Sequence, residues 1–258
     1  FLKWYHPMSE NVALCNNTVS RHFGYKGVRM RVKKTCFIML CLLACARTFG
    51  APADAPGVPP EQALALLKEG NAAFVQGKMT HPGQDTPRRS EVSAAQQPFA
   101  VIVSCSDSRV PPEIIFDRGL GDLFVVRDAG NVVWDVEIGS IEYAVEHLGV
   151  RLVVVLGHKR CGAVGAAVRN SGDESEHIGS ILKMIAPAVD KVKGAPGDQI
   201  ENAVRANIEL VRDRLRGEEP VLARMVKEHK LKIVGAYYDL DSGAVAFFPE
   251  TPSADAGK

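Results

Sequence analysis

The chain has 258 residues, 46% of them hydrophobic, which is enough for one globular domain with a sizeable core. Its formal net charge is +1, but residues 1–51 carry 8 Lys and Arg against one Glu, so residues 52–258 carry 23 Lys and Arg against 29 Asp and Glu. This mildly acidic balance gives no support for nucleic acid as a partner.

The basic excess lies in a pattern typical of export signals. From Met30, the stretch MRVKKTCFIMLCLLACA joins basic residues to an apolar run, and small residues and prolines follow. The run is short for a membrane span, so we expect a secretory signal peptide over 30–51, with a buried N-terminal helix as the alternative. Residues 1–29 show no periodic pattern, and we expect them to lie upstream of the true start or to be an expression artefact.

Export determines the expected location of the protein. We expect a periplasmic or secreted protein, residues 52–258, with no membrane span once the signal is removed. The letters LLAC (42–45) also loosely resemble a lipoprotein signal, which would leave a lipid anchor on Cys45 as the alternative. Only Cys105 and Cys161 then remain of the six cysteines.

From about residue 59 to 248, buried strands alternate with amphipathic helices, without a repeat or a long linker. A helix opens at Pro60 and closes near Gly77, and a polar loop follows to about Gln97. The predicted strands are apolar runs within 99–105, 121–130, 150–158, 231–240 and 243–249. The later helices are predicted over 136–148, from 161 onward, and over 175–193 and 199–216. This alternation predicts a single α/β domain with a mainly parallel sheet flanked by helices.

The stretch VIVSCSDSRV (101–110) ends a buried strand with three polar side chains at alternate positions. Cys105, Asp107 and Arg109 point to the same side if the chain stays extended there. A thiol, a carboxylate and a guanidinium gathered at the end of a buried strand indicate a chemical site.

A second group of polar residues, GHKRCG, follows the third strand. His158 and Cys161 come 53 and 56 residues after Cys105, at another strand's carboxyl end, where open α/β sheets place their sites. Two thiolates and an imidazole form a known catalytic zinc set that leaves the fourth position open. A Cys105–Cys161 disulfide is the alternative in an exported protein, but it would need neither Asp107 nor Arg109.

These motifs together resemble the β-class carbonic anhydrases. The resemblance is carried by CSDSRV, FVVRDAGN (124–131), IEYAV (141–145), GHKRCGA and LKIVGAYYDLDSGAV (231–245), and it covers roughly residues 59–248. It implies one zinc ion per subunit, bound by Cys105, His158 and Cys161. It also implies a dyad of Asp107 and Arg109, in which Asp107 is the fourth zinc ligand in a closed state.

The resemblance further implies a substrate cleft for carbon dioxide and bicarbonate, in a homodimer or a higher homo-oligomer. The cleft positions match Gln96, Phe124, Tyr143 and the backbone at Gly162.

Part of the family has a secondary bicarbonate pocket built from a Trp, an Arg and a Tyr. Here Arg127 and Tyr238 match, but Ile102 stands at the Trp position, which argues against bicarbonate inhibition of the usual kind. The chain also carries Asp128 where the family commonly has Asn.

The implied function is the reversible hydration of carbon dioxide to bicarbonate and a proton by a zinc-bound hydroxide, a lyase reaction. An inactive bicarbonate-sensing relative with structural zinc is one alternative, although structural sites are usually closed by a fourth Cys or His. A zinc hydrolase of a CO₂-like substrate such as carbon disulfide is another, and it would use the same ligands.

Hydroxide availability explains why a metal is needed. Lowering the pKa of water from about 15.7 to about 7 is worth on the order of 12 kcal/mol, more than one carboxylate base supplies. Two thiolates cancel the formal charge of zinc, so we expect a higher pKa for its water than with three imidazoles. Activity should therefore rise on the alkaline side, and stopped-flow rates that stay flat between about pH 6.5 and pH 9 would contradict this.

Overall fold

The computed structural model describes residues 57–169, 172 and 174–249. The expected signal peptide, residues 1–29 and the anchor candidate Cys45 lie outside the described residues, so the predictions about them stay predictions. Among the residues described, no helix is both long and apolar enough to cross a membrane.

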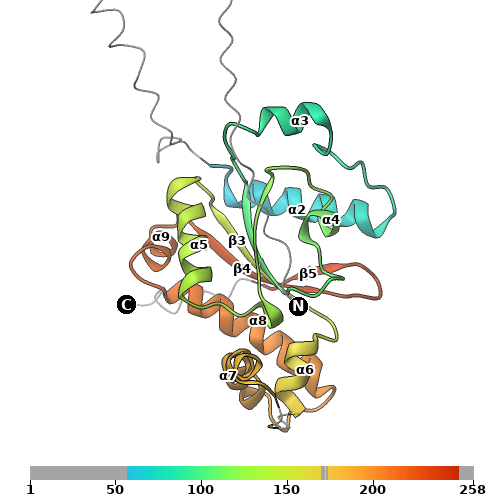
Figure 1. Cartoon of the computed structure of the whole chain (residues 1–258), viewed down its shortest axis with the longest axis vertical. Coiled ribbons are helices and arrows are strands. Elements are labelled where there is room, and N and C mark those ends of the chain that lie inside the picture. Colours follow the sequence, from blue (N-terminus) through green and yellow to red (C-terminus); the bar gives the residue numbers. More distant parts are fainter. Residues whose placement is uncertain (1–56, 170–171, 173, 250–258) are drawn as a thin grey trace, which may run out of the picture. The chain divides into compact units, whose positions relative to one another are not determined.

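Five strands form one sheet in the order β2-β1-β3-β4-β5 (Figure 1). The first four are mutually parallel, and β5 pairs antiparallel with β4. Their bounds are β1 Ala100–Ser104, β2 Leu123–Arg127, β3 Leu152–His158, β4 Lys232–Tyr238 and β5 Val245–Phe247. The predicted α/β class with a mainly parallel sheet is confirmed.

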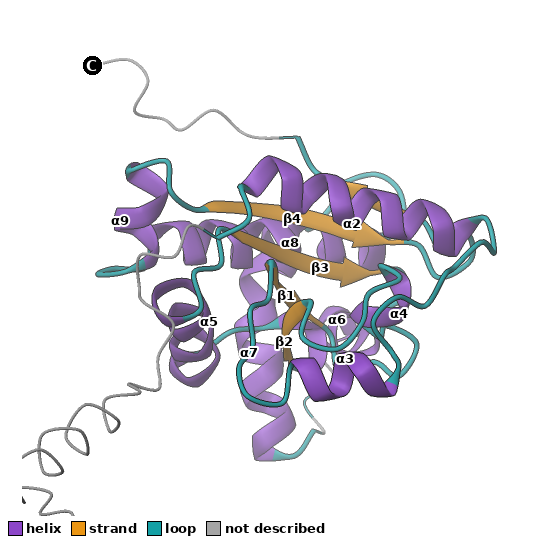
Figure 2. Ribbon diagram, turned by 90° about the horizontal axis from the view of Figure 1, so that it is seen from above, coloured by secondary structure: helices purple, strands orange, loops and turns teal. Residues whose placement is uncertain are grey.

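Helices cover both faces of this sheet (Figure 2). Alternate strand residues point to opposite faces, so Val101 and Val103 belong to one hydrophobic cluster while Ile102 belongs to the other. One face packs against α2 (Pro60–Val75) and α4 (Pro112–Ile115). The opposite face packs against α5 (Asp135–His147), α6 (Gly162–Arg169), α7 (Glu176–Lys191), α8 (Gln199–Gly217) and α9 (Leu222–Lys227). Coverage on both sides explains why β1 and β3 are buried throughout.

Several short elements were not predicted from the sequence. The polar loop before β1 contains α3 (Thr86–Glu91), which begins where the Asp85 side chain accepts the backbone N–H of Arg88 at 2.9 Å. The helices α4 and α9 and the 3₁₀ helix Ala129–Asn131 were also missed. Each is three to six residues long, too short to show a hydrophobic period.

The strand order creates a switch point between β1 and β3. From β1 the chain goes to β2 on one side of the sheet, and it then returns to β3 on the other side of β1. A crevice forms at the carboxyl ends of two strands related in this way, which is where open α/β sheets bind ligands. Because Ser104 pairs with Leu156, the residues that follow β1 lie beside the end of β3.

Two helical glycines should respond in opposite ways to alanine. In Gly70→Ala on α2, the new Cβ would lie 1.7 Å from the carbonyl oxygen of Phe116, whereas in Gly139→Ala on α5 it meets nothing within 4 Å. We expect Gly70→Ala to lower the free energy of unfolding by about 1–3 kcal/mol through overpacking. Gly139→Ala should raise it by about 0.5–1 kcal/mol through lost flexibility of the unfolded chain. Urea denaturation measures both, and equal effects of the two substitutions would be inconsistent with this packing.

Candidate metal centre

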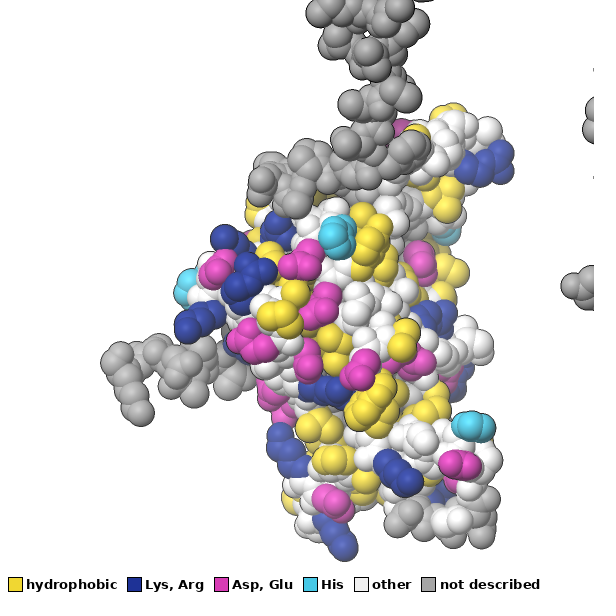
Figure 3. Space-filling view, turned by 60° about the vertical axis from the view of Figure 1, so that its left-hand side comes forward, with side chains coloured by type: hydrophobic (Ala, Val, Ile, Leu, Met, Phe, Trp, Pro, Cys, Tyr) yellow, Lys and Arg dark blue, Asp and Glu magenta, His cyan; other side chains and the backbone are white. Residues whose placement is uncertain are grey.

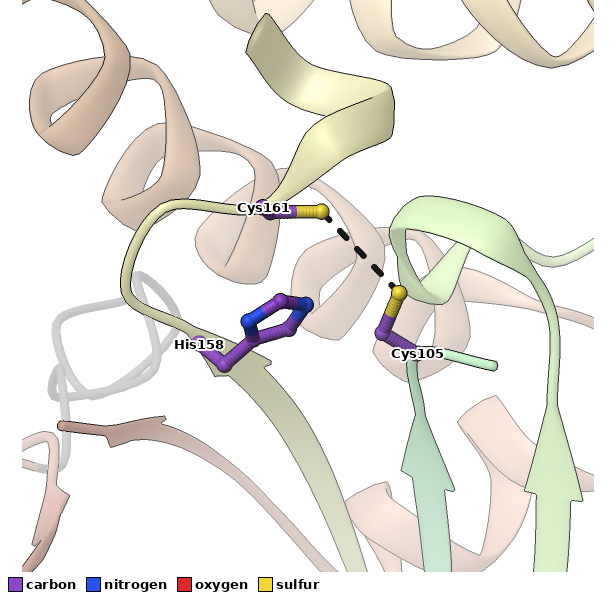
Figure 4. A group of neighbouring side chains, drawn as sticks. All are labelled: Cys105, His158 and Cys161. Atoms are coloured by element: carbon purple, nitrogen blue, oxygen red, sulfur yellow. Dashed lines mark hydrogen bonds between the residues drawn. The ribbon is translucent and has the colours of Figure 1, made fainter. Parts of the chain in front are cut away.

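Three buried side chains converge where β1 and β3 end (Figure 4). Cys105 directly follows β1, His158 is the last residue of β3, and Cys161 immediately precedes α6. Cys105, His158 and Cys161 are 4%, 0% and 2% exposed, respectively. Their potential ligand atoms all lie within 4.8 Å of one another. The structure therefore brings together the three predicted zinc ligands.

The spacing of the two sulfur atoms fits a metal better than a disulfide. The Sγ atoms of Cys105 and Cys161 are 4.0 Å apart, about twice the length of an S–S bond, and both cysteines are free. Zn–S bonds of about 2.3 Å at a tetrahedral angle would separate two sulfur ligands by about 3.8 Å. The donor set and its spacing thus suit a tetrahedral zinc ion, and the disulfide alternative is not what the structure shows.

The imidazole of His158 is oriented as a metal ligand would be. Its Nδ1 lies 3.0 Å from the carbonyl oxygen of Lys159, which can only accept, so Nδ1 carries the hydrogen. Its Nε2 is left without a hydrogen on the side of the two sulfurs, and this buried atom has no hydrogen-bond partner. A buried nitrogen without a partner is costly, and a metal ion at this position would satisfy it.

Hydrogen bonding shifts the pKa values of the two thiols in opposite directions. The Cys105 sulfur is within hydrogen-bond distance of the Cys161 sulfur and accepts the backbone N–H of Gly130 at 3.2 Å, and these bonds lower the pKa of Cys105 well below its ordinary value despite burial. The hydrogen bond to Cys105, together with burial, raises the pKa of Cys161. A bound dication would favour the deprotonated form of both thiols.

Asp107 and Arg109 form a bidentate ion pair at the edge of this group. Arg109 donates from Nε at 2.9 Å and from Nη2 at 2.7 Å to the two carboxylate oxygens, and its backbone N–H donates at 2.9 Å. The hydrogen bonds from Arg109 hold the pKa of Asp107 well below its usual range. The Oδ2 atom of Asp107 also lies 3.8 Å from Nε2 of His158, so this carboxylate borders the metal position.

Two further residues hold the site and were not predicted in these roles. Arg127 donates from Nε to the carbonyl of Cys105 at 3.1 Å and from Nη2 to that of Asp107 at 2.7 Å, so it orders the loop after β1. Gly130, at φ 75°, supplies the N–H to Cys105, and its own carbonyl accepts from the buried side chain of Asn207 at 2.8 Å. The glycine in DAGN was the only sequence signal for this arrangement.

The predicted cleft residues lie at different distances from the metal position. Gly162 is exposed and directly follows Cys161, whereas Gln96 is exposed in the loop before β1. Phe124 pairs with Val101, four residues before Cys105 along β1, which is about 13 Å along the strand. The Tyr143 ring lies 6.5 Å from the Phe124 ring and is half exposed. Their roles in binding substrate stay predictions.

The residues at the secondary-pocket positions pack in different surroundings. Ile102 and Tyr238 are buried in the same hydrophobic cluster, while the donors of Arg127 are engaged by the loop after β1. Asp128 acts through its backbone, since its carbonyl accepts from Ser106 at 3.2 Å. Nothing in the structure explains the carboxylate at this position.

Taken together, the fold and the site define an α/β protein with a buried Cys-His-Cys group, able to hold a metal ion, at its topological switch point. A family model described as carbonic anhydrase matches residues 100–245. Carbonic anhydrase 2 of Mycobacterium tuberculosis is 40% identical over 191 residues, covering 73% of this chain and 92% of that protein. The carbonic anhydrase of Mycolicibacterium smegmatis is 39% identical over 194 residues, covering 74% and 94%.

Solved structures agree with the sequence relatives. The β-carbonic anhydrase CcaA superposes with a TM-score of 0.59 at 28% identity, covering 73% of this chain and 95% of that chain. A tetrameric β-carbonic anhydrase from the ascomycete Sordaria macrospora gives a TM-score of 0.58 at 26% identity, with coverages of 73% and 95%. The chain belongs to the β-carbonic anhydrase family, and it is an enzyme of the lyase class.

The Asp128 carboxyl should make folding stability depend on pH. Burial, together with the charges of Glu137 and Cys105, raises its pKa in the folded protein. An acid with a raised folded pKa loses its proton more readily in the unfolded chain, so stability falls as pH rises above its ordinary value near 3.9. We expect Asp128→Asn to raise the thermal midpoint at pH 7 and to leave it unchanged at about pH 3. Calorimetry at the two pH values checks this, and equal shifts at both would contradict it.

Proposed function

We propose that this protein hydrates carbon dioxide reversibly to bicarbonate and a proton with one zinc ion bound by Cys105, His158 and Cys161. The observation that carries the proposal is a set of three buried ligands bordered by an acid that an arginine restrains. When bound, zinc supplies a water acidic enough to serve as hydroxide near neutral pH.

The carboxylate of Asp107 orients that reactant. It is ionised across the neutral range, so it accepts a hydrogen bond from the attacking oxygen and points a lone pair toward carbon dioxide. Its Oδ2 atom lies 3.8 Å from Nε2 of His158, so it would border a metal ion held by the three ligands. An acceptor placed in this way positions the nucleophile without having to remove its proton.

Arg109 restrains the acid. With both carboxylate oxygens bonded to the guanidinium, Asp107 is held back from becoming the fourth ligand itself. Structural zinc sites are closed by four protein side chains, whereas catalytic sites keep one position for water. The paired state of Asp107 therefore favours an active enzyme over a relative in which zinc is only structural.

Phe124 lies beside Val101, about 13 Å along the strand from Cys105, and Tyr143 lies next to Phe124. We propose that the two rings line the cleft of a second subunit in a homodimer. Three large hydrophobic side chains at the start of α5 and along it are exposed, namely Trp134, Val136 and Tyr143, by 57%, 75% and 48%. Figure 3 shows hydrophobic side chains on the face around α5 among charges of both signs. The Sordaria macrospora enzymes are tetrameric, which supports a homo-oligomer.

The role of the dyad is testable by stopped-flow hydration of carbon dioxide on the zinc-loaded protein at about pH 8.5. Wild type should far exceed the buffer blank, and Asp107→Ala should abolish the rate because the attacking oxygen loses its acceptor. Arg109→Lys should not restore function, because one ammonium cannot hold both carboxylate oxygens. Full activity in Arg109→Lys would remove the restraining role, and a wild type that binds zinc but shows no rate would overturn the proposed function.

A subunit-mixing experiment tests the shared cleft. His158→Ala lacks a metal ligand but keeps Phe124 and Tyr143, while the double variant Phe124→Ala/Tyr143→Ala keeps the ligands. Each homodimer should be nearly inactive, and mixed dimers should regain part of the activity because one of their two sites is complete. Native mass spectrometry confirms that mixed dimers form. Mixed dimers that stay as inactive as their parents would rule out a cleft built from two subunits.

A further inference from the structure

The loop between two of the metal ligands is only two residues long and has an unusual backbone. Lys159 and Arg160 separate His158 from Cys161, and Arg160 has a φ of 53°. That left-handed conformation is unfavourable for a residue with a side chain and persists where surrounding contacts impose it. Some other part of the molecule must therefore hold this loop in place.

The turn between β4 and β5 supplies the contacts. The carboxylate of Asp241 accepts from Arg160 at 2.9 Å and 2.5 Å, through two guanidinium nitrogens and two separate oxygens. The same carboxylate lies 3.0 Å from Nζ of Lys159, which also donates to Asp239 at 3.3 Å. The Asp241 side chain thus forms ion pairs with both residues of the loop.

The loop backbone is held at the same place. The N–H of Lys159 donates to the carbonyl of Tyr238 at 2.9 Å. The N–H of Arg160 donates to Glu201, in the first turn of α8, at 3.1 Å. The other carboxylate oxygen of Glu201 accepts the hydroxyl of Tyr237. These contacts join the loop to β4 and α8, so a shift of the loop would break several bonds together.

The turn that presents Asp241 is itself anchored. Asp239 accepts the N–H groups of Asp241 at 2.7 Å and Ser242 at 3.2 Å, which closes the turn. The buried side chain of Asn71 on α2 donates to the carbonyl of Gly243 at 2.9 Å and accepts from Val245 at 2.9 Å. These hydrogen bonds fix the backbone of the turn that carries Asp241, although the side chain of Asp241 is exposed.

The loop transmits its position to the metal ligands through one hydrogen bond. The carbonyl of Lys159 is the acceptor that fixes the hydrogen of His158 on Nδ1 and leaves Nε2 for the metal. Acceptors of this kind govern metal affinity, because they set the tautomer and the ring orientation of the ligand. A displaced Lys159 would loosen His158 directly, and a displaced Arg160 would shift the adjacent Cys161.

We propose that Asp241 is a positioning residue for the metal centre, because it holds Lys159 and Arg160 and so keeps His158 and Cys161 in ligand geometry. This inference rests on the proposed zinc site. It adds that zinc retention depends on a turn whose acid lies 81 residues from the loop residue it binds.

The test is the rate of zinc release from the full-length protein into excess chromogenic chelator. Asp241→Asn keeps the size of the side chain but weakens the grip on both cations, so release should be about five- to tenfold faster. Asp241→Glu keeps the charge and should stay within about twofold of wild type. The matched control is Glu209→Gln. Glu209 is on α8, eight residues beyond Glu201, and the substitution breaks an exposed ion pair in which its carboxylate lies 3.1 Å from Nζ of Lys191. This variant should release zinc at the wild-type rate.

A second variant approaches the same contact from the loop. Arg160→Gln should also speed zinc release. The double variant with Asp241→Asn should release zinc more slowly than the product of the two single rate increases predicts, because both substitutions remove the same ion pair. Cobalt substitution gives a spectroscopic readout. The cysteine-to-cobalt charge-transfer bands should change in Asp241→Asn and stay the same in Glu209→Gln. If Asp241 contributed only to overall stability, the bands of the folded Asp241→Asn protein would not change.

The outcomes separate this inference from the proposed function. If wild type binds no zinc, the proposed function fails first. If wild type holds zinc and Asp241→Asn releases it at the same rate with unchanged cobalt bands, Asp241 has no positioning role. The positioning role would likewise be overturned if Asp241→Asn and Arg160→Gln had independent effects on the rate of zinc release. The same holds if Asp241→Glu sped zinc release as much as Asp241→Asn does.

Discussion

The adjacency of β1 and β3 is the constraint on which the site depends. Parallel pairing places the carboxyl ends of the two strands at one edge, and the register of Ser104 with Leu156 brings Cys105 beside the end of β3. Both strands are buried throughout and their residues alternate between two packed faces, so a slip by one residue would exchange the side chains that each face packs. The register of the sheet thereby sets how the candidate metal ligands at the ends of β1 and β3 lie relative to each other.

Around this edge, the charges are held by groups that come from distant parts of the chain. The sulfur of Cys105 accepts the N–H of Gly130, and the carbonyl of Gly130 accepts the side-chain amide of Asn207 on α8. The acid at the site is held by its neighbour Arg109, and the loop that carries both is ordered by Arg127 at the end of β2. Burial makes each unpaired polar group costly, so the candidate metal ligands are also groups that the fold must support with hydrogen bonds.

Much of this was predictable because local patterns report local structure. Unbroken apolar runs such as AVIVS and LVVVLGH predicted buried strands, and the polar residues that follow each run marked the site. The short elements α3, α4 and α9 were missed because so few residues show no period. The supporting roles of Arg127 and Asn207 were missed for a different reason: an arginine or an asparagine is equally compatible with the surface until its neighbours are known.

The sequence by itself determined the fold class, and it predicted the three candidate metal ligands and the acid–arginine pair, because each depends on residue type and on spacing within a strand or loop. Tertiary structure decided which distant groups hold them. The grip of Asp241 on Lys159 and Arg160 spans about 80 residues and exists only because β4 pairs with β3 and ends beside it. Periodicity records which side of a strand faces the core, but it does not record which strand lies next to it, and that pairing determines which charges meet.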